Sequence, residues 1–170
     1  MTDDDHVLLR AADAHWRESN QMKVLNTDLA KQLAAATLGA RIWRLRPGQA
    51  STKHCHLKQE ELYVLLEGEG KIRIGDDADP LTIEPLDSLL IRPATVRQIF
   101  NDTDADALWL VVGAPPESAN TLEMTAQQLT RLYPEGPKSL PPELADGSPV
   151  PRRGGGRQSP AAGGPTSTRS

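Results

Sequence analysis

The sequence has little cysteine and little aromatic character, and it has no long apolar run. Cys55 is its single cysteine, which excludes an internal disulfide and suits a reducing compartment. Three tryptophans, two tyrosines and one phenylalanine leave most of the core to aliphatic side chains. The longest strongly apolar stretch, about 107–114, is strand-sized, whereas a membrane span needs roughly 18 residues. We therefore expect a cytoplasmic protein without a membrane segment.

We also expect no secretory leader, and the part of the chain predicted to fold has no dense basic patch. The sequence begins with the acidic run Asp3–Asp5, where a leader would have basic residues followed by an apolar stretch. The formal net charge is −4, which argues against nucleic acid as a main partner. A length of 170 residues indicates one folded domain.

Between residues 37 and 116 the chain alternates short β-prone runs with turn signals. About eight short strands at this spacing are typical of a small antiparallel barrel or jelly roll. We therefore predict an all-β fold. The expected strands are Arg41–Arg46, Ser51–His56, Glu61–Glu67, Lys71–Ile74, Leu81–Glu84, Ser88–Arg92, Val96–Phe100 and Ala107–Val112.

Short flanking segments are expected on both sides of this barrel. Residues 1–36 are predicted to form an N-terminal arm with a short helix over Asp28–Ala35, and Val7–Leu9 could add a strand, for example as an arm exchanged in a dimer. Residues 117–134 should carry a C-terminal helix over Ala126–Leu132.

The ends of that C-terminal helix are marked in the sequence. Thr125 and Gln128 have the spacing of a capping box, and Pro134 stops the helix. Residues 135–170 are rich in proline and glycine and poor in large apolar side chains. Such a segment buries too little surface to offset its ordering entropy, so we expect a disordered tail.

His54 and His56, with Glu61 five residues later, are the candidate functional residues. Side chains alternate along a strand, so the two imidazoles share a face and Cys55 points away as a packed thiol. A hairpin through Lys58–Glu60 would bring Glu61 beside them. Two histidines and one carboxylate on one face can bind a divalent metal in a facial arrangement.

The stretch from Gly48 to Gly68, with His54, His56 and Glu61 at their spacing between the two glycines, resembles the first motif of the cupin superfamily. The resemblance extends over about Arg41–Ala114 and implies the single-domain, conserved-barrel type, an RmlC-like jelly roll. The second cupin motif is only partly matched: Asp87, Pro93 and Asn101 fit, whereas Leu86 replaces a glycine and Arg97 replaces a histidine.

Arg97 occupies the position at which the resemblance implies a fourth metal ligand. A guanidinium has no lone pair to offer and stays charged, so it cannot replace the imidazole. In one alternative, which we favour, His54, His56 and Glu61 hold the metal and Arg97 binds an anionic substrate. In the other, Arg97 pairs with Glu61 and the barrel is metal-free.

Further expectations concern the ligand and the assembly. Tyr63 lies two residues after Glu61, should share its face, and is a candidate substrate-binding residue beside Arg97. The metal could be iron, manganese, nickel or zinc, since mixed nitrogen and oxygen ligation fits all four.

Two classes of function follow. One is an enzyme, an oxygenase or isomerase acting on a small anionic metabolite. The other is a non-catalytic barrel that binds or senses a small molecule or a metal. The resemblance also implies a homodimer, and it does not decide between the two classes.

Overall fold

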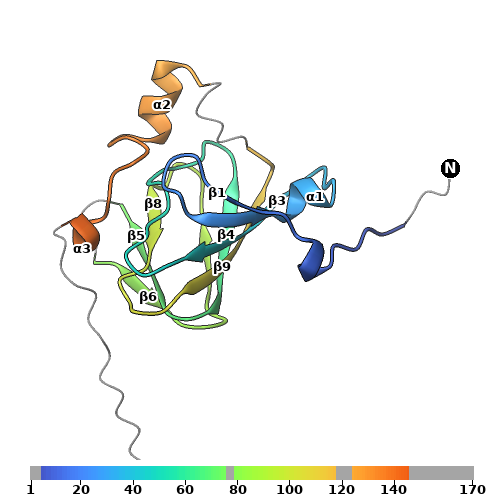
Figure 1. Cartoon of the computed structure of the whole chain (residues 1–170). Coiled ribbons are helices and arrows are strands. Elements are labelled where there is room, and N and C mark those ends of the chain that lie inside the picture. Colours follow the sequence, from blue (N-terminus) through green and yellow to red (C-terminus); the bar gives the residue numbers. More distant parts are fainter. Residues whose placement is uncertain (1–4, 76–78, 118–123, 146–170) are drawn as a thin grey trace, which may run out of the picture.

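The structure is a computed structural model, and it describes residues 5–75, 79–117 and 124–145. Nine strands in these ranges form two antiparallel sheets (Figure 1). The larger sheet has the strand order β1-β2-β3-β9-β4-β7, and the smaller has the order β6-β5-β8. The strands are β1 (Trp16–Glu18), β2 (Leu25–Asp28), β3 (Gly39–Leu45), β4 (Glu60–Glu67), β5 (Gly70–Ile74), β6 (Leu81–Ile83), β7 (Ser88–Ile91), β8 (Arg97–Phe100) and β9 (Ala107–Ala114).

The core lies between the two sheets and is built by alternation along the strands. In β4 and β9, every second side chain is buried, and Leu65 on β4 lies opposite Trp109 on β9. Both are fully buried, and Ile72 and Ile99 from the smaller sheet belong to the same cluster. Burial of these side chains removes apolar surface from water and stabilises the barrel. The predicted all-β jelly roll is confirmed.

The outer face of the larger sheet is apolar as well. Leu62 on β4 lies beside Leu90 on β7 and Val112 on β9, and Leu62 and Leu90 are 39% and 49% exposed. An apolar sheet face of this kind is the surface that pairing with a second copy would cover. The homodimer stays a prediction.

Short helices flank the barrel. They are the 3-10 helix η1 (Ala11–Asp13), α1 (Leu29–Gln32), α2 (Ala126–Leu132) and α3 (Pro142–Ala145). In the view of Figure 1, α2 lies above the barrel, with α1 and α3 on opposite sides. The capping box of Thr125 and Gln128 at the start of α2 is confirmed, whereas α1 ends earlier than the predicted Asp28–Ala35. Among the described helices, none is both long and apolar enough to cross a membrane.

Two predictions for the ends of the chain need correction. Residues 135–145 were expected in the tail, but they lie against the barrel: Glu135 forms an ion pair with Lys53, and the Ser139 carbonyl accepts a hydrogen bond from Gln98. These polar contacts fix a segment that has few large apolar side chains. Val7–Leu9 forms no strand. The remainder of the predicted disordered tail, 146–170, lies outside the described residues.

Candidate metal centre

The two histidines lie on an extended segment and not on the strand predicted over Ser51–His56. Isolated bridges hold this segment to β8, where the His54 amide donates to the Arg97 carbonyl (3.1 Å) and the Arg97 amide donates to the His54 carbonyl (2.9 Å). Residues that exchange both backbone hydrogen bonds lie directly opposite each other, with their side chains on the same face. The side chain of Arg97 is therefore directed to the same side as the His54 imidazole.

Glu61 reaches the same place from β4. It lies opposite Gly113 on β9, and the Gln59 side chain occupies the space that a side chain at position 113 would take. One ligand atom each from His54, His56 and Glu61 lies within 4.8 Å of the others. The prediction that Glu61 lies beside the two histidines is confirmed. Their role as metal ligands stays a prediction.

The donor atoms have the chemistry that a metal requires. His54 Nδ1 lies 2.7 Å from the Thr52 carbonyl oxygen, an acceptor, so Nδ1 carries the proton and the lone pair is on Nε2. His56 Nε2 lies 3.0 Å from Glu61 Oε1. Two ligands at about 2.1 Å from one ion and at right angles to each other are also about 3 Å apart. The His56–Glu61 pair therefore has the spacing of two ligands of one ion, and without an ion His56 donates a hydrogen bond to Glu61.

Arg97 occupies the fourth side of the cluster and holds the second oxygen of Glu61. Its Nη2 donates to Glu61 Oε2, and its Nε donates to the Tyr63 hydroxyl at 3.1 Å. The Tyr63 hydroxyl in turn donates to Oε2 at 2.5 Å. Nη1 donates to the backbone carbonyls of His54 and Thr95. Oε2 is thus fixed by two donors, while Oε1 faces the imidazoles.

This placement differs from the favoured alternative, in which Arg97 points into the pocket. The Arg97 side chain is 2% exposed, and its nitrogens already donate to the protein. A guanidinium paired with a buried carboxylate gains more from that contact than from facing water. Tyr63 does line the cavity, but its hydroxyl is engaged with Glu61. The contact of the second alternative, Arg97 on Glu61, is the one that the structure contains.

The electrostatics keep His54 and Glu61 in the protonation states that bind metals. Burial, and then the charge of Arg97, lower the pKa of His54 to about 3, so its imidazole is neutral at pH 7. Burial pushes the pKa of Glu61 upwards, but the hydrogen bond from His56 and the charge of Arg97 outweigh it and hold that pKa well below its usual range. Burial raises the pKa of Tyr63, which therefore stays protonated and donates.

Glu117, which the sequence did not single out, fixes the turn between the histidines and Glu61. Its carboxylate accepts hydrogen bonds from the backbone amides of Leu57 (2.9 Å), Lys58 (2.9 Å) and Gln59 (3.1 Å). Burial raises the pKa of Glu117, but these three amides more than offset it and lower that pKa. One side chain after β9 thus holds the loop that carries His56 to Glu61.

We expect Glu117→Gln to lower the free energy of unfolding at pH 7 by about 1–3 kcal/mol, because three charge-assisted hydrogen bonds weaken. The folded pKa of Glu117 is below its unfolded value of 4.5. Its contribution is therefore present above about pH 4.5 and is lost as the pH falls through the folded pKa. Urea denaturation at pH 7 and at about pH 3 should show that the difference between wild type and variant shrinks in acid. An equal difference at both pH values, or an equal effect of the exposed Glu67→Gln, contradicts this role.

Tyr133, just after α2, covers the cluster from the C-terminal side. Its ring centroid lies 6.2 Å from that of His54, and it is buried beside Cys55. Cys55 faces away from the imidazoles, as predicted, with Sγ 3.5 Å from the Arg131 carbonyl oxygen. Burial raises the pKa of Tyr133, so the phenol keeps its proton. No local sequence pattern predicts this contact, since Tyr133 is 79 positions from His54 and outside the barrel.

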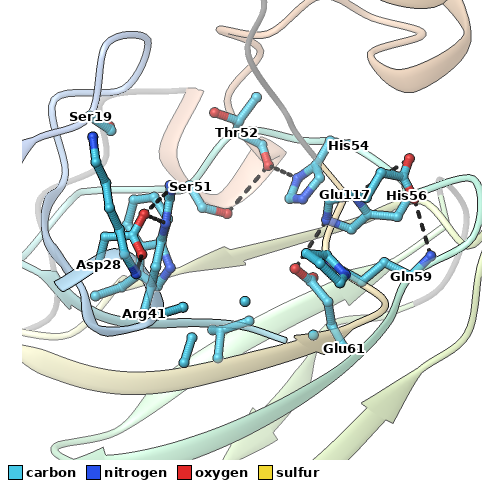
Figure 2. Close-up of a pocket in the computed structure, with 18 of the residues that line it drawn as sticks. Ser19, Asp28, Arg41, Ser51, Thr52, His54, His56, Gln59, Glu61 and Glu117 are labelled. Carbon is cyan, nitrogen blue, oxygen red and sulfur yellow. Dashed lines mark hydrogen bonds and ion pairs between the residues drawn. The ribbon is translucent and has the colours of Figure 1, made fainter. Parts of the chain in front are cut away.

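A cavity of about 840 Å³ adjoins the cluster. His54, His56 and Glu61 lie on one side of it, and Asp28 and Arg41 lie on the other (Figure 2). Arg97 does not line this cavity. The inner face of the larger sheet forms the floor of the cavity between these two sides (Figure 2).

Comparisons with known proteins agree with this architecture. Residues 41–113 match the family model described as Cupin domain. A sugar phosphate isomerase of the cupin superfamily from Silicibacter pomeroyi is 24% identical, over 65% of this chain and 76% of that chain, with a TM-score of 0.58. A predicted oxalate decarboxylase from Thermotoga maritima is 20% identical, over 65% and 100%, with a TM-score of 0.56. A cupin protein from Bacteroides fragilis is 24% identical, over 72% and 92%, with a TM-score of 0.54.

A search of curated proteins finds no match to this chain. At these identities, the solved structures show a shared fold and leave the activity open. The fold, the motif from Gly48 to Gly68 and the family match all agree. Residues 41–113 therefore form a cupin domain, by their match to the family model and by their fold.

Proposed function

We propose that the barrel binds a divalent transition metal through His54, His56 and Glu61 and acts on a small anionic metabolite. The observation that supports this most directly is the convergence of the three donor atoms within 4.8 Å beside the cavity. His54 Nε2 carries a lone pair, and Glu61 is ionised with Oε1 directed at the imidazoles. These are the forms in which His54 and Glu61 bind metals, and His56 would release its Nε2 proton when the ion binds.

In this proposal Arg97 is a positioning residue. It holds Glu61 through Oε2, together with Tyr63, and leaves Oε1 as a single-oxygen ligand. Partners of this kind fix the orientation of ligating side chains and tune their basicity. The positive charge of Arg97 also lowers the affinity for a dication relative to a site with a fourth neutral ligand.

A metal bound here would polarise a carbonyl or hydroxy acid, as an isomerase requires, or bind dioxygen, as an oxygenase requires. The known relatives do not choose between these classes. Oxygen consumption and isomer formation, measured over a panel of small carboxylic and phosphorylated acids with metal-loaded protein, would separate them. Turnover without oxygen uptake would assign isomerase or lyase chemistry.

The metal assignment is tested by elemental analysis of the purified chain beside two single variants. We expect close to one transition-metal ion per chain in the wild type and a loss of most of it in His54→Ala, because one of three ligands is removed. His15→Ala is the matched control, since His15 is exposed and far from the cluster in sequence. Equal metal content in wild type and His54→Ala would refute the ligand assignment.

A second candidate is a metal-free barrel that binds a metabolite without catalysis. The contact of Arg97 with Glu61 favours it, because the guanidinium already neutralises the carboxylate that would hold the ion. This candidate predicts that wild-type protein carries no metal and takes up none when dialysed against zinc or manganese.

A further inference from the structure

We infer that the side of the cavity opposite the metal centre is a binding site for a terminal oxyanion, a carboxylate or a phosphate, with Arg41 as its anchor. This inference extends the proposed function, because it places the second end of the same metabolite. It starts from the sheet register: Arg41 on β3 lies opposite Val111 on β9, and Val111 lies opposite Tyr63 on β4. Neighbouring strands are about 4.8 Å apart, so the backbone of Arg41 is roughly 10 Å from that of Tyr63.

The Arg41 guanidinium is held in place from its other side. Asp28, on the neighbouring strand β2, accepts at Oδ2 from Nε (3.1 Å) and Nη2 (2.7 Å) of Arg41. Oδ1 of Asp28 accepts from the Lys31 amide and caps α1, so the carboxylate itself is fixed (Figure 2). No acceptor among the described residues meets Nη1 of Arg41. An oriented guanidinium with unused donors at a cavity is suited to binding a carboxylate or phosphate.

The charge at this end of the cavity is positive. Arg17, Lys31 and Arg41 line it, and Asp28 is the acidic residue beside them, so three positive charges face one negative charge and the net charge is +2. The acidic lining residues Glu61 and Glu117 belong to the metal-centre side. The potential therefore favours an anion beside Arg41 over one elsewhere along the cavity.

One cavity joins the two ends. Between them, Gly39 on β3 lies opposite Gly113 on β9, and neither has a side chain. The Gln59 side chain occupies the space above Gly113, where an added Cβ would lie 2.4 Å from the Gln59 Cδ, and its Nε2 would lie 3.8 Å from a Cβ added at Gly39. A ligand that extends along the cavity from the imidazoles to Arg41 would therefore pass beside the Gln59 amide. Its two ends would be an oxygen-rich head at the metal centre and an oxyanion at Arg41, as in a short hydroxy or keto acid or a phosphorylated one.

Isothermal titration of metal-free protein with inorganic phosphate and, separately, with succinate tests the anion site without the metal centre. We expect at least one probe to bind, with phosphate alone indicating a phosphorylated ligand and succinate alone a carboxylate. Arg41→Gln should weaken that binding at least about tenfold. Arg41→Lys keeps the positive charge but loses the paired N–H donors of the guanidinium, and it should weaken the binding less. Arg92→Gln, at an exposed arginine, should leave it unchanged.

Lys31→Gln provides a second variant at an exposed position, should Arg41→Gln fail to fold, and it should weaken anion binding at least about twofold. Two results overturn the inference: no binding of either probe to wild type at about 50 mM, or binding that Arg41→Gln and Lys31→Gln leave unchanged. Normal metal content with no anion binding would reject this site alone. Anion binding that depends on Arg41, in a protein that takes up no metal, would instead reject the metal centre and keep the anion site.

Discussion

Arg97→Met should lower the free energy of unfolding by about 3–5 kcal/mol, the range for breaking a buried ion pair by removing one partner. The Glu61 side chain is 11% exposed, and Arg97 is its charged partner on Oε2. Without the guanidinium, the carboxylate remains in a low-dielectric interior with hydrogen bonds from His56 and Tyr63 alone. Chemical denaturation at pH 7 measures the loss.

Two controls isolate the buried charge as the cause. Arg92→Met removes an arginine whose side chain is 76% exposed and should change the free energy of unfolding by no more than about 0.5 kcal/mol. Adding Glu61→Gln to Arg97→Met should recover part of the loss, because the unpaired carboxylate is then gone. A loss below about 1 kcal/mol in Arg97→Met, or no recovery in the double variant, would mean that the pair does not hold the site together.

Arg97→His should raise the affinity for a divalent metal by at least about 100-fold. The substitution removes a positive charge beside the ion and adds an imidazole directly opposite His54, where the backbone bridge directs the side chain inward. At an effective dielectric constant of about 20, a cation about 5 Å from a dication costs several kcal/mol, and tenfold in affinity corresponds to about 1.4 kcal/mol. Competition with a chromophoric chelator measures both affinities.

Arg97→Met separates the two contributions in that experiment. It removes the charge without supplying a nitrogen donor, so its metal affinity should lie between those of wild type and Arg97→His. If Arg97→His binds metal no better than wild type, a histidine at position 97 does not reach the ion as a fourth ligand. If Arg97→Met equals Arg97→His, the charge accounts for the whole effect and the imidazole does not coordinate.

Local patterns in the sequence were sufficient to predict the barrel and the cluster. Strand alternation placed His54 and His56 on one face and Cys55 on the other, and the short polar turn brought Glu61 back beside them. These relations depend on residues a few positions apart. The strands β4 and β9 follow for the same reason, since both alternate buried and less buried side chains, although β4 begins one residue before the predicted Glu61–Glu67 and β9 ends two residues after the predicted Ala107–Val112.

Contacts between residues that are far apart in the sequence could not be predicted from it. Whether the Arg97 side chain points into the cavity or pairs with Glu61 depends on how deeply the Glu61 carboxylate is buried. That burial is set by the packing of the whole barrel. Glu117 is 60 positions from Leu57, and the pairing of β9 with β4 brings its carboxylate to the Leu57 amide. Strands β1 and β2 have weak patterns of their own and are defined by pairing, β1 with β2 and β2 with β3.

X-ray absorption spectroscopy at the edge of the bound metal tests the central claim most directly, because it reports the ligands of the ion itself. We predict a first shell that includes nitrogen at about 2.0–2.2 Å, with the outer-shell scattering of two imidazoles in wild type and of one in His56→Ala. A spectrum equal to that of the hydrated ion, or a histidine count that His56→Ala leaves unchanged, would contradict a metal held by His54, His56 and Glu61.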